Sequence, residues 1–334
     1  MYKHTHGKFS VLVALFGNLL VTILKSIVAF ISGSSSMFAE SVHSFADTLN
    51  QSLLMIGLVR SKKPADSYRG YGYGIERFFW SLVSACGILF IGAGITIYHS
   101  IVSIIELPET PYELTYFNFL ILIFAFLVEG ATLIIAVNEM RRGKKLTRRV
   151  FKEADPVTLA VVYEDGAAVL GVLVAVLAQA LSYFTQNYIY DAVGGIIVGL
   201  ILGSLAILLI RKNYNYIIGK SIDDERKEEI IDFIKEDPCI ENLLDFKSSA
   251  VDFGKYRVFI TVEWNGSPLY EDIYEAGDLK EEFDEIKDDF QEFAKLMFKM
   301  TDRIPRLVGN RIDALEKRVQ DAYPEIAYLD IEIN

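Results

Sequence analysis

Residues 37–59 read MFAESVHSFADTLNQSLLMIGLV, an apolar stretch interrupted at regular intervals by ionisable and amide side chains. A bilayer core about 30 Å thick is crossed by a helix of roughly 20 predominantly apolar residues. Glu40, His43, Asp47 and Asn50 are spaced by three, four and three residues. At about 3.6 residues per turn, this spacing places them on one face of a helix. The stretch therefore predicts a transmembrane helix with one polar face.

Five further stretches on either side of this one are apolar enough to cross a bilayer. The chain is 52% hydrophobic with a mean hydropathy of +0.30, whereas soluble domains are about 45–50% apolar. This composition excludes a soluble enzyme and a nucleic-acid-binding protein. We therefore predict an all-α bundle of six transmembrane helices, in an integral, multi-pass membrane protein that contacts the lipid bilayer. The five additional stretches are roughly residues 10–31, 78–103, 114–140, 157–182 and 190–210.

The basic residues between the predicted spans orient the bundle, because Lys and Arg accumulate on the cytoplasmic side. Three connections, GSSS, ELPETPYE and SYFTQNYIYD, contain neither Lys nor Arg. The second and fourth connections and the end of the sixth span are basic. We therefore expect both termini in the cytoplasm and the bundle in the cell (inner) membrane. The basic residues are Arg60, Lys62, Lys63 and Arg69, then Arg141, Arg142, Lys144, Lys145, Arg148, Arg149 and Lys152, then Arg211 and Lys212.

The charge balance divides the chain into two predicted domains. Residues 1–212 hold 17 Lys and Arg against 14 Asp and Glu, whereas residues 213–334 hold 16 against 30. In the acidic part, residues 256–264 and 327–333 alternate apolar and polar side chains as half-buried strands do, and a weaker strand is expected near 243–249. Amphipathic helices are expected at about 223–236 and 305–322. We predict a cytoplasmic α+β domain with a three-stranded sheet and an acidic helical insertion at about 268–300.

The fifth predicted span adds two carboxylates, Glu164 and Asp165. At about 1.5 Å per residue, Asp47 lies about 18 Å and Asp165 about 12 Å from the cytoplasmic surface, so the two helices can meet near the midplane. A charged group at that depth is costly and needs a partner or a function. Histidine nitrogen with carboxylate oxygens suits a transition metal such as Zn²⁺. His43, Asp47 and Asp165 therefore form a candidate metal site, with structural pairing of the carboxylates as the alternative.

Other polar residues in the predicted spans have less defined roles. Glu40 and Asn50 are candidates for a proton relay or for structural hydrogen bonding. Glu129 could relay protons or pair with Lys25 or another helix. Lys25 lies toward the outer end of its span, and we expect it to extend its ammonium group to the membrane surface.

The chain resembles the cation diffusion facilitators. The resemblance rests on the six spans, the HxxxD of His43 and Asp47, Asp165, the glycine-rich DAVGGIIVG that opens the sixth span, and the α+β tail. The segments ESVHSFADTLNQ, YGYGIERFFWSL and EDGAAVLG are closest to the branch that includes a mitochondrial zinc exporter. The resemblance implies a homodimer that exchanges a divalent metal for protons, with His43, Asp47 and Asp165 as metal ligands. It implies metal as transported substrate and no prosthetic group.

Three departures from the family pattern affect these expectations. The fifth span of relatives usually carries HxxxD, but Val161 stands four residues before Asp165. Glu164 or water would have to supply the missing ligand. No histidine follows His99, so a histidine-based zinc site in the tail is not expected. The histidine-rich cytoplasmic loop of relatives is replaced by Arg and Lys.

The function predicted from these observations is Zn²⁺/H⁺ antiport out of the cytoplasm by alternating access, with divalent metal ions and protons as partners and no nucleic acid. His43 suits proton exchange, because its ordinary pKa is near 6.5, and metal and protons compete for the same lone pairs. The alternatives are efflux of Fe²⁺, Co²⁺, Cd²⁺ or Mn²⁺ by the same fold, a membrane metal sensor, or a metalloenzyme. No HExxH motif supports an enzyme.

Overall fold

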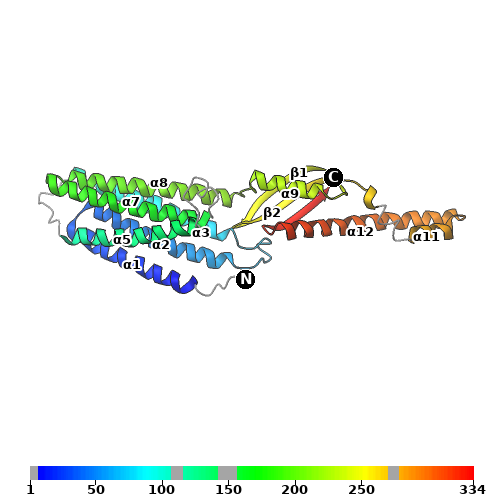
Figure 1. Ribbon diagram of the computed structural model, residues 1–334, viewed down its shortest axis with the longest axis horizontal. Helices are drawn as coiled ribbons and strands as arrows, with labels where there is room; N and C mark the ends of the chain where they lie inside the picture. Colours follow the sequence, from blue (N-terminus) through cyan, green and yellow to red (C-terminus); the bar gives the residue numbers. More distant parts are fainter. Residues whose placement is uncertain (1–6, 107–115, 142–155, 270–277) are drawn as a thin grey trace. The chain divides into compact units, whose positions relative to one another are not determined.

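The computed structural model describes residues 7–106, 116–141, 156–269 and 278–334 (Figure 1). The chain divides into two compact units. The first consists of Met1–Lys62 and Glu76–Asn215, and the second of Lys63–Ile75 and Tyr216–Asn334. The loop Lys63–Ile75 therefore belongs with the C-terminal residues, although it lies between two helices of the first unit in the sequence.

The described residues of the first unit form helices joined by short turns. The segment Glu76–Ile105 is a continuous helical stretch in which one turn widens to a π-helix. Single π-helical turns inside α-helices occur frequently at functional sites. The elements are α1 (Gly7–Ser32), α2 (Ser35–Ser61), α3 (Glu76–Gly87), η1 (Ile88–Ala93), α4 (Gly94–Ile105), α5 (Tyr116–Arg141), α7 (Pro156–Thr185) and α8 (Ile189–Ile217).

Four stretches of the described residues are helices long and apolar enough to cross a membrane: Glu76–Ile105, Asn118–Asn138, Val162–Thr185 and Ile189–Ile217. A shorter apolar helix, Leu19–Ser32, lies within α1. The helix α2 has 27 residues, enough to cross about 30 Å of hydrocarbon at about 1.5 Å per residue, but its polar face lowers its hydropathy. The structure thus shows an integral membrane protein with four apolar spans, and the six-span bundle remains a proposal.

Small and branched apolar side chains pack the helices of the first unit together. One buried cluster joins α1, α2, α5 and α7, and a second joins α2, η1 and α8. Both clusters include α2, so α2 has neighbours on two sides and its polar face lies inside the unit. The first cluster contains Val28, Ala29, Met37, Ile121, Leu122, Ala125, Val172 and Ala175, and the second contains Ala46, Ile88, Ala93, Leu202 and Ala206.

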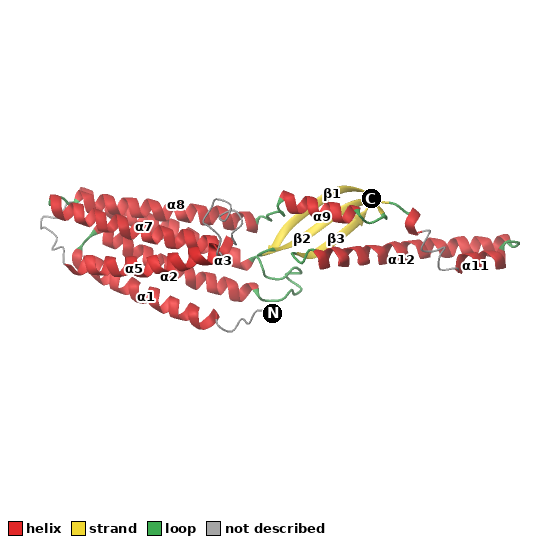
Figure 2. Cartoon of the chain, viewed as in Figure 1, coloured by secondary structure: helices red, strands yellow, loops and turns green. Residues whose placement is uncertain are grey.

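The second unit contains a three-stranded sheet in the order β1-β2-β3 (Figure 2). The strand β2 (Lys255–Trp264) pairs antiparallel with β1 (Ile240–Asp252) and parallel with β3 (Ile326–Ile333), with Ser248 opposite Val258 and Val258 opposite Leu329. The prediction of a small three-stranded α+β tail is confirmed.

Helices cover one face of this sheet and complete its hydrophobic core. Alternate residues of β2, Val258, Ile260 and Val262, are fully buried, as expected for strands with one face on a core. They belong to the same cluster as side chains of α9 (Asp224–Lys235) and α12 (Phe290–Ala322). The helical members of the cluster are Ile230, Ile234, Leu315 and Val319.

The helix predicted at 305–322 begins 15 residues earlier, at Phe290. The expected start near residue 305 is therefore wrong. The helix continues through Pro305, since the apolar stripe extends on both sides of it. Part of the predicted insertion at 268–300 forms α11 (Asp278–Ile286) and the start of α12, and residues 270–277 lie outside the described part of the chain.

Candidate functional site

The polar face of α2 is buried in the structure. Glu40, His43 and Asn50 are 0%, 1% and 3% exposed. The Nε2 atom of His43 lies 3.2 Å from Oδ2 of Asp47, one turn further along α2. Neither ring nitrogen of His43 has a hydrogen-bond partner among the described residues. Buried polar atoms are nearly always paired, so these nitrogens are available for a ligand.

The carboxylates of α7 approach the same face of α2. Asn50 donates a hydrogen bond to Glu164 (Nδ2–Oε1 3.1 Å), and Ser84 of α3 donates one to Asn50 (Oγ–Oδ1 2.8 Å). These bonds tie α2, α3 and α7 together. Asp165 follows Glu164 directly, so the bond from Asn50 to Glu164 brings the two predicted metal-binding segments near each other.

The structure does not gather a complete set of metal ligands. Within the described ranges, no group of three or more His, Cys, Asp or Glu side chains is arranged to hold an ion. His43 and Asp47 are together, whereas Glu164 is bonded to Asn50. The side chain of Val161 lies outside the described part of the chain. The set His43, Asp47, Asp165 and Glu164 therefore remains a prediction.

Lys25 does not extend to the membrane surface, and that expectation is wrong. Its side chain is fully buried, and Nζ lies 2.9 Å from Oε2 of Glu40 and 2.9 Å from Oε1 of Glu129. The three residues come from α1, α2 and α5. Of the roles considered for Glu129, pairing with Lys25 is the one observed. An ammonium between two carboxylates is better stabilised away from water than it would be alone.

Asp191 is a buried polar residue that the sequence analysis did not identify. It lies in the first turn of α8 and is fully buried. Its carboxylate accepts hydrogen bonds from Ser34 Oγ (2.9 Å), Ser35 N (2.6 Å) and Ser36 Oγ. The first backbone amides of a helix have no partner within the helix. Asp191 accepts a hydrogen bond from such an amide, that of Ser35, at the start of α2. The sequence signal was the run Ser34–Ser36 at the start of α2, because serine is typical of a helix start.

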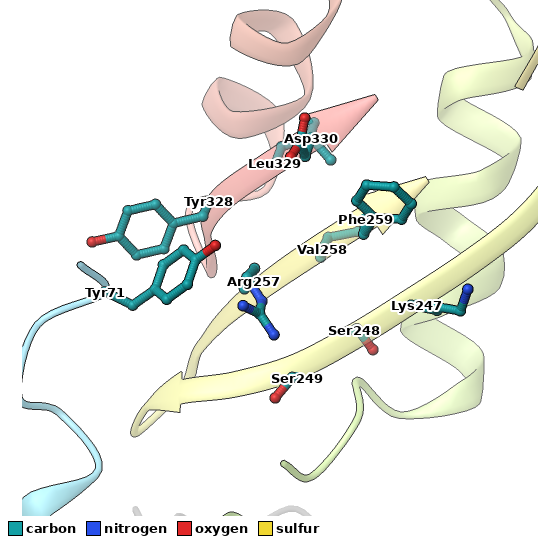
Figure 3. A pocket seen from close by; sticks show the side chains of 10 residues that line it. All are labelled: Tyr71, Lys247, Ser248, Ser249, Arg257, Val258, Phe259, Tyr328, Leu329 and Asp330. Atoms are coloured by element: carbon teal, nitrogen blue, oxygen red, sulfur yellow. The ribbon is translucent and has the colours of Figure 1, made fainter. Parts of the chain in front are cut away.

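The second unit has a cavity of about 430 Å³ against its sheet (Figure 3). The guanidinium of Arg257 lies 4.6 Å from the ring centre of Tyr71, which packs edge-on against Tyr328 at 4.9 Å. Tyr71 belongs to the loop Lys63–Ile75, so this loop contributes a wall. The lining includes one carboxylate and neither histidine nor cysteine. It consists of Tyr71, Lys247, Ser248, Ser249, Arg257, Val258, Phe259, Tyr328, Leu329 and Asp330.

Ionisable side chains buried among apolar spans are typical of integral membrane proteins that move ions or protons. Residues 11–218 match the cation efflux transmembrane domain. The chain therefore belongs to the cation efflux family, which consists of transporters and not of enzymes.

Comparison with curated proteins gives relatives that match nearly the whole chain. Metal tolerance protein C4 of Arabidopsis thaliana is 34% identical over 98% of this chain and 73% of its own length. The proton-coupled zinc antiporter SLC30A9, mitochondrial, of Homo sapiens is 33% identical over 97% of this chain. The chain spans only 58% of that protein. Magnetosome protein MamB of Magnetospirillum gryphiswaldense is 27% identical over 69% of this chain and 73% of its own length. The resemblance to the zinc branch of cation diffusion facilitators is confirmed.

Proposed function

We propose that this chain is a Zn²⁺/H⁺ antiporter that exports zinc from the cytoplasm by alternating access as a homodimer. Membership in the cation efflux family supports divalent metal transport, and the human relative is named a proton-coupled zinc antiporter. The observation that carries the proposal is the buried His43–Asp47 pair, whose nitrogen and oxygen atoms suit zinc. The proposed location is the cell (inner) membrane, with both termini in the cytoplasm.

In the proposed cycle, His43 and Asp47 bind the metal together with Asp165. Metal displaces protons from these side chains, because protons and metal compete for the same lone pairs. The bundle then opens to the other side, where protons displace the metal. Three protein ligands leave one of the four positions that Zn²⁺ prefers open. Water or Glu164 would fill it, and Glu164 would first have to exchange its bond to Asn50.

Transport by purified protein in liposomes tests the proposal. Zinc uptake and internal pH are followed with separate dyes under an imposed pH gradient. Alanine at His43, Asp47 or Asp165 should abolish zinc-dependent proton flux, while Ser52→Ala, one turn beyond Thr48 on the same helix, should retain it. Near-normal flux in Asp47→Ala or Asp165→Ala would contradict the site assignment, and zinc binding without any flux in the native chain would indicate a sensor.

A second candidate is efflux of another divalent ion by the same residues. Val161 stands where the relatives' pattern has histidine, and fewer nitrogen ligands shift preference toward oxygen-preferring ions such as Mn²⁺. The same assay with Zn²⁺, Fe²⁺, Co²⁺, Cd²⁺ and Mn²⁺ in turn distinguishes the substrates. Proton flux with Mn²⁺ that exceeds the flux with Zn²⁺ would replace zinc in the proposal.

A further inference from the structure

Lys25, Glu40 and Glu129 form a charged cluster separate from the predicted metal ligands. The ammonium lies 2.9 Å from one oxygen of each carboxylate. The side chains of Lys25 and Glu40 are completely buried, and that of Glu129 is 16% exposed. The two carboxylates come from α2 and α5, and the ammonium between them comes from α1.

One ammonium does not satisfy this pair of carboxylates. The second oxygen of each, Oε1 of Glu40 and Oε2 of Glu129, is buried and has no hydrogen-bond partner within the described residues. The cluster therefore has buried acceptor atoms that the ammonium does not use. Several carboxylate oxygens around one point are the ligands that divalent cations prefer. Two carboxylates in this arrangement provide more charge than a lysine needs and match the charge of a divalent metal.

The packing against Glu40 preserves space at its unpaired oxygen. Gly171 of α7 faces it, and a Cβ atom at that position would lie 2.5 Å from Oε1 of Glu40. Glycine at position 171 lets this oxygen lie against the backbone of α7 in its observed position. The ammonium comes from Lys25 of α1, so the chain itself supplies the cation.

We propose that Glu40 and Glu129 form a second intramembrane cation site whose permanent occupant is the Lys25 ammonium. Glu40 lies three residues before His43 on α2, a spacing that makes them neighbours on one helix face, so a second mobile metal ion there would repel an ion at His43 and Asp47. A tethered ammonium supplies positive charge that cannot leave with the substrate. Under the proposed function, on which this consequence rests, each chain carries one divalent ion per cycle.

Counting bound ions in the purified full chain tests the second site. Lys25→Met keeps the apolar length of the side chain and removes the charge, whereas Lys25→Arg keeps the charge. In calorimetric titrations with Zn²⁺ alone and Mn²⁺ alone, the Met variant should bind one more ion per chain than the native protein. The Arg variant should bind the native number, and Lys25→Met with Glu129→Gln should return to it.

A second background separates this inference from the proposed function. Lys25→Met should add one ion even when Asp47→Asn and Asp165→Asn remove the predicted transport site. If that extra ion appears while the transport assay fails, the second site stands and the antiporter proposal falls.

A folded Lys25→Met protein, with a single elution peak and cooperative unfolding, that binds no additional ion would overturn the inference. If folded Lys25→Met protein were obtained only when Zn²⁺ or Mn²⁺ is present, that result would support the inference. If neither metal recovers the variant while Lys25→Arg folds, the carboxylates accept only an ammonium or guanidinium attached to the chain. That result would also overturn the inference.

Discussion

Asp66 organises the loop Lys63–Ile75 through four hydrogen bonds. Its Oδ2 atom accepts from the Tyr73 hydroxyl (2.7 Å) and the Lys63 ammonium (3.1 Å). Its Oδ1 atom accepts from the backbone amides of Tyr68 and Arg69, each at 3.0 Å. The Tyr73 hydroxyl, and then Lys63, lower the pKa of the Asp66 carboxyl from 3.8 to about 2. These bonds favour the ionised form, which the loop needs to hold its turn.

Protonation of Asp66 should open this turn at low pH. A carboxyl whose pKa is lower in the folded loop contributes stability above its unfolded value of 3.8 and loses it as the pH falls toward about 2. Amide hydrogen exchange at Tyr68 and Arg69, corrected for the intrinsic rate, should therefore show constant protection from pH 6 to about 4 and declining protection below it.

Asp66→Asn is the matched control, because it keeps the shape of the side chain and removes the charge. Its amides at 68 and 69 should be less protected at every pH and should lack the decline below pH 4. Equal protection in both proteins, or no decline in the native protein, would show that the turn does not depend on the carboxylate.

The close packing of α8 depends on positions without side chains. A Cβ atom at Gly195 would lie 3.0 Å from the carbonyl oxygen of Ser35 and closer still to the hydroxyl of Ser100. At Gly203 the nearest atom, Cβ of Ala93, would be 3.5 Å away, an ordinary contact. Small residues let helices in membranes approach closely, and the first position leaves no space for any other residue.

Gly195→Ala should therefore lower the free energy of unfolding by about 1–3 kcal/mol, the typical cost of overpacking. Gly203→Ala should have no such cost, since alanine favours helix over glycine by up to about 1 kcal/mol. Thermal unfolding in detergent measures the effects of both substitutions. The readout is the reaction of Cys86 and the buried Cys239 with a thiol label. Equal melting temperatures for the two variants would contradict the packing argument.

Periodicity identified most elements, because it reflects which face of an element is buried. The polar face of α2 and the alternation of β2 appear directly in the sequence, and the structure buries Glu40, His43 and Val258 accordingly. The ion pair between Lys25 and Glu129 joins residues 104 positions apart. The sequence allowed this pair only as one of several roles for Glu129, because no local pattern selects a contact across that separation. The extent of α12 was missed, because proline usually ends or kinks a helix, whereas α12 continues through Pro305.

The two units differ in what stabilises them. The first buries hydrogen-bonded charges among apolar helices, and its candidate site depends on pairs of residues from separate helices. The second has a conventional core, with Val258, Ile260 and Val262 against two helices. The grouping of Lys63–Ile75 with the second unit could not be predicted, since a short polar loop carries no signal of the surface on which it packs.

We expect the apolar core of the second unit to be sufficient for folding without metal. The chain has no histidine after His99, and the structure shows no cluster of three metal-ligating side chains among its described residues. We therefore expect a fragment of residues 213–334 to fold cooperatively and to self-associate in EDTA. Its melting temperature and its mass by light scattering should be the same with EDTA and with Zn²⁺.

Ile260→Ala provides the comparison that makes this result informative. Ile260 is fully buried in β2, and removing its side chain should cost about 2–5 kcal/mol. A large effect of this variant together with no effect of EDTA would assign the stability of the unit to apolar packing. If EDTA instead lowered the melting temperature or dissociated the fragment, the carboxylates of this acidic unit would be binding a structural metal ion, and packing alone would be insufficient.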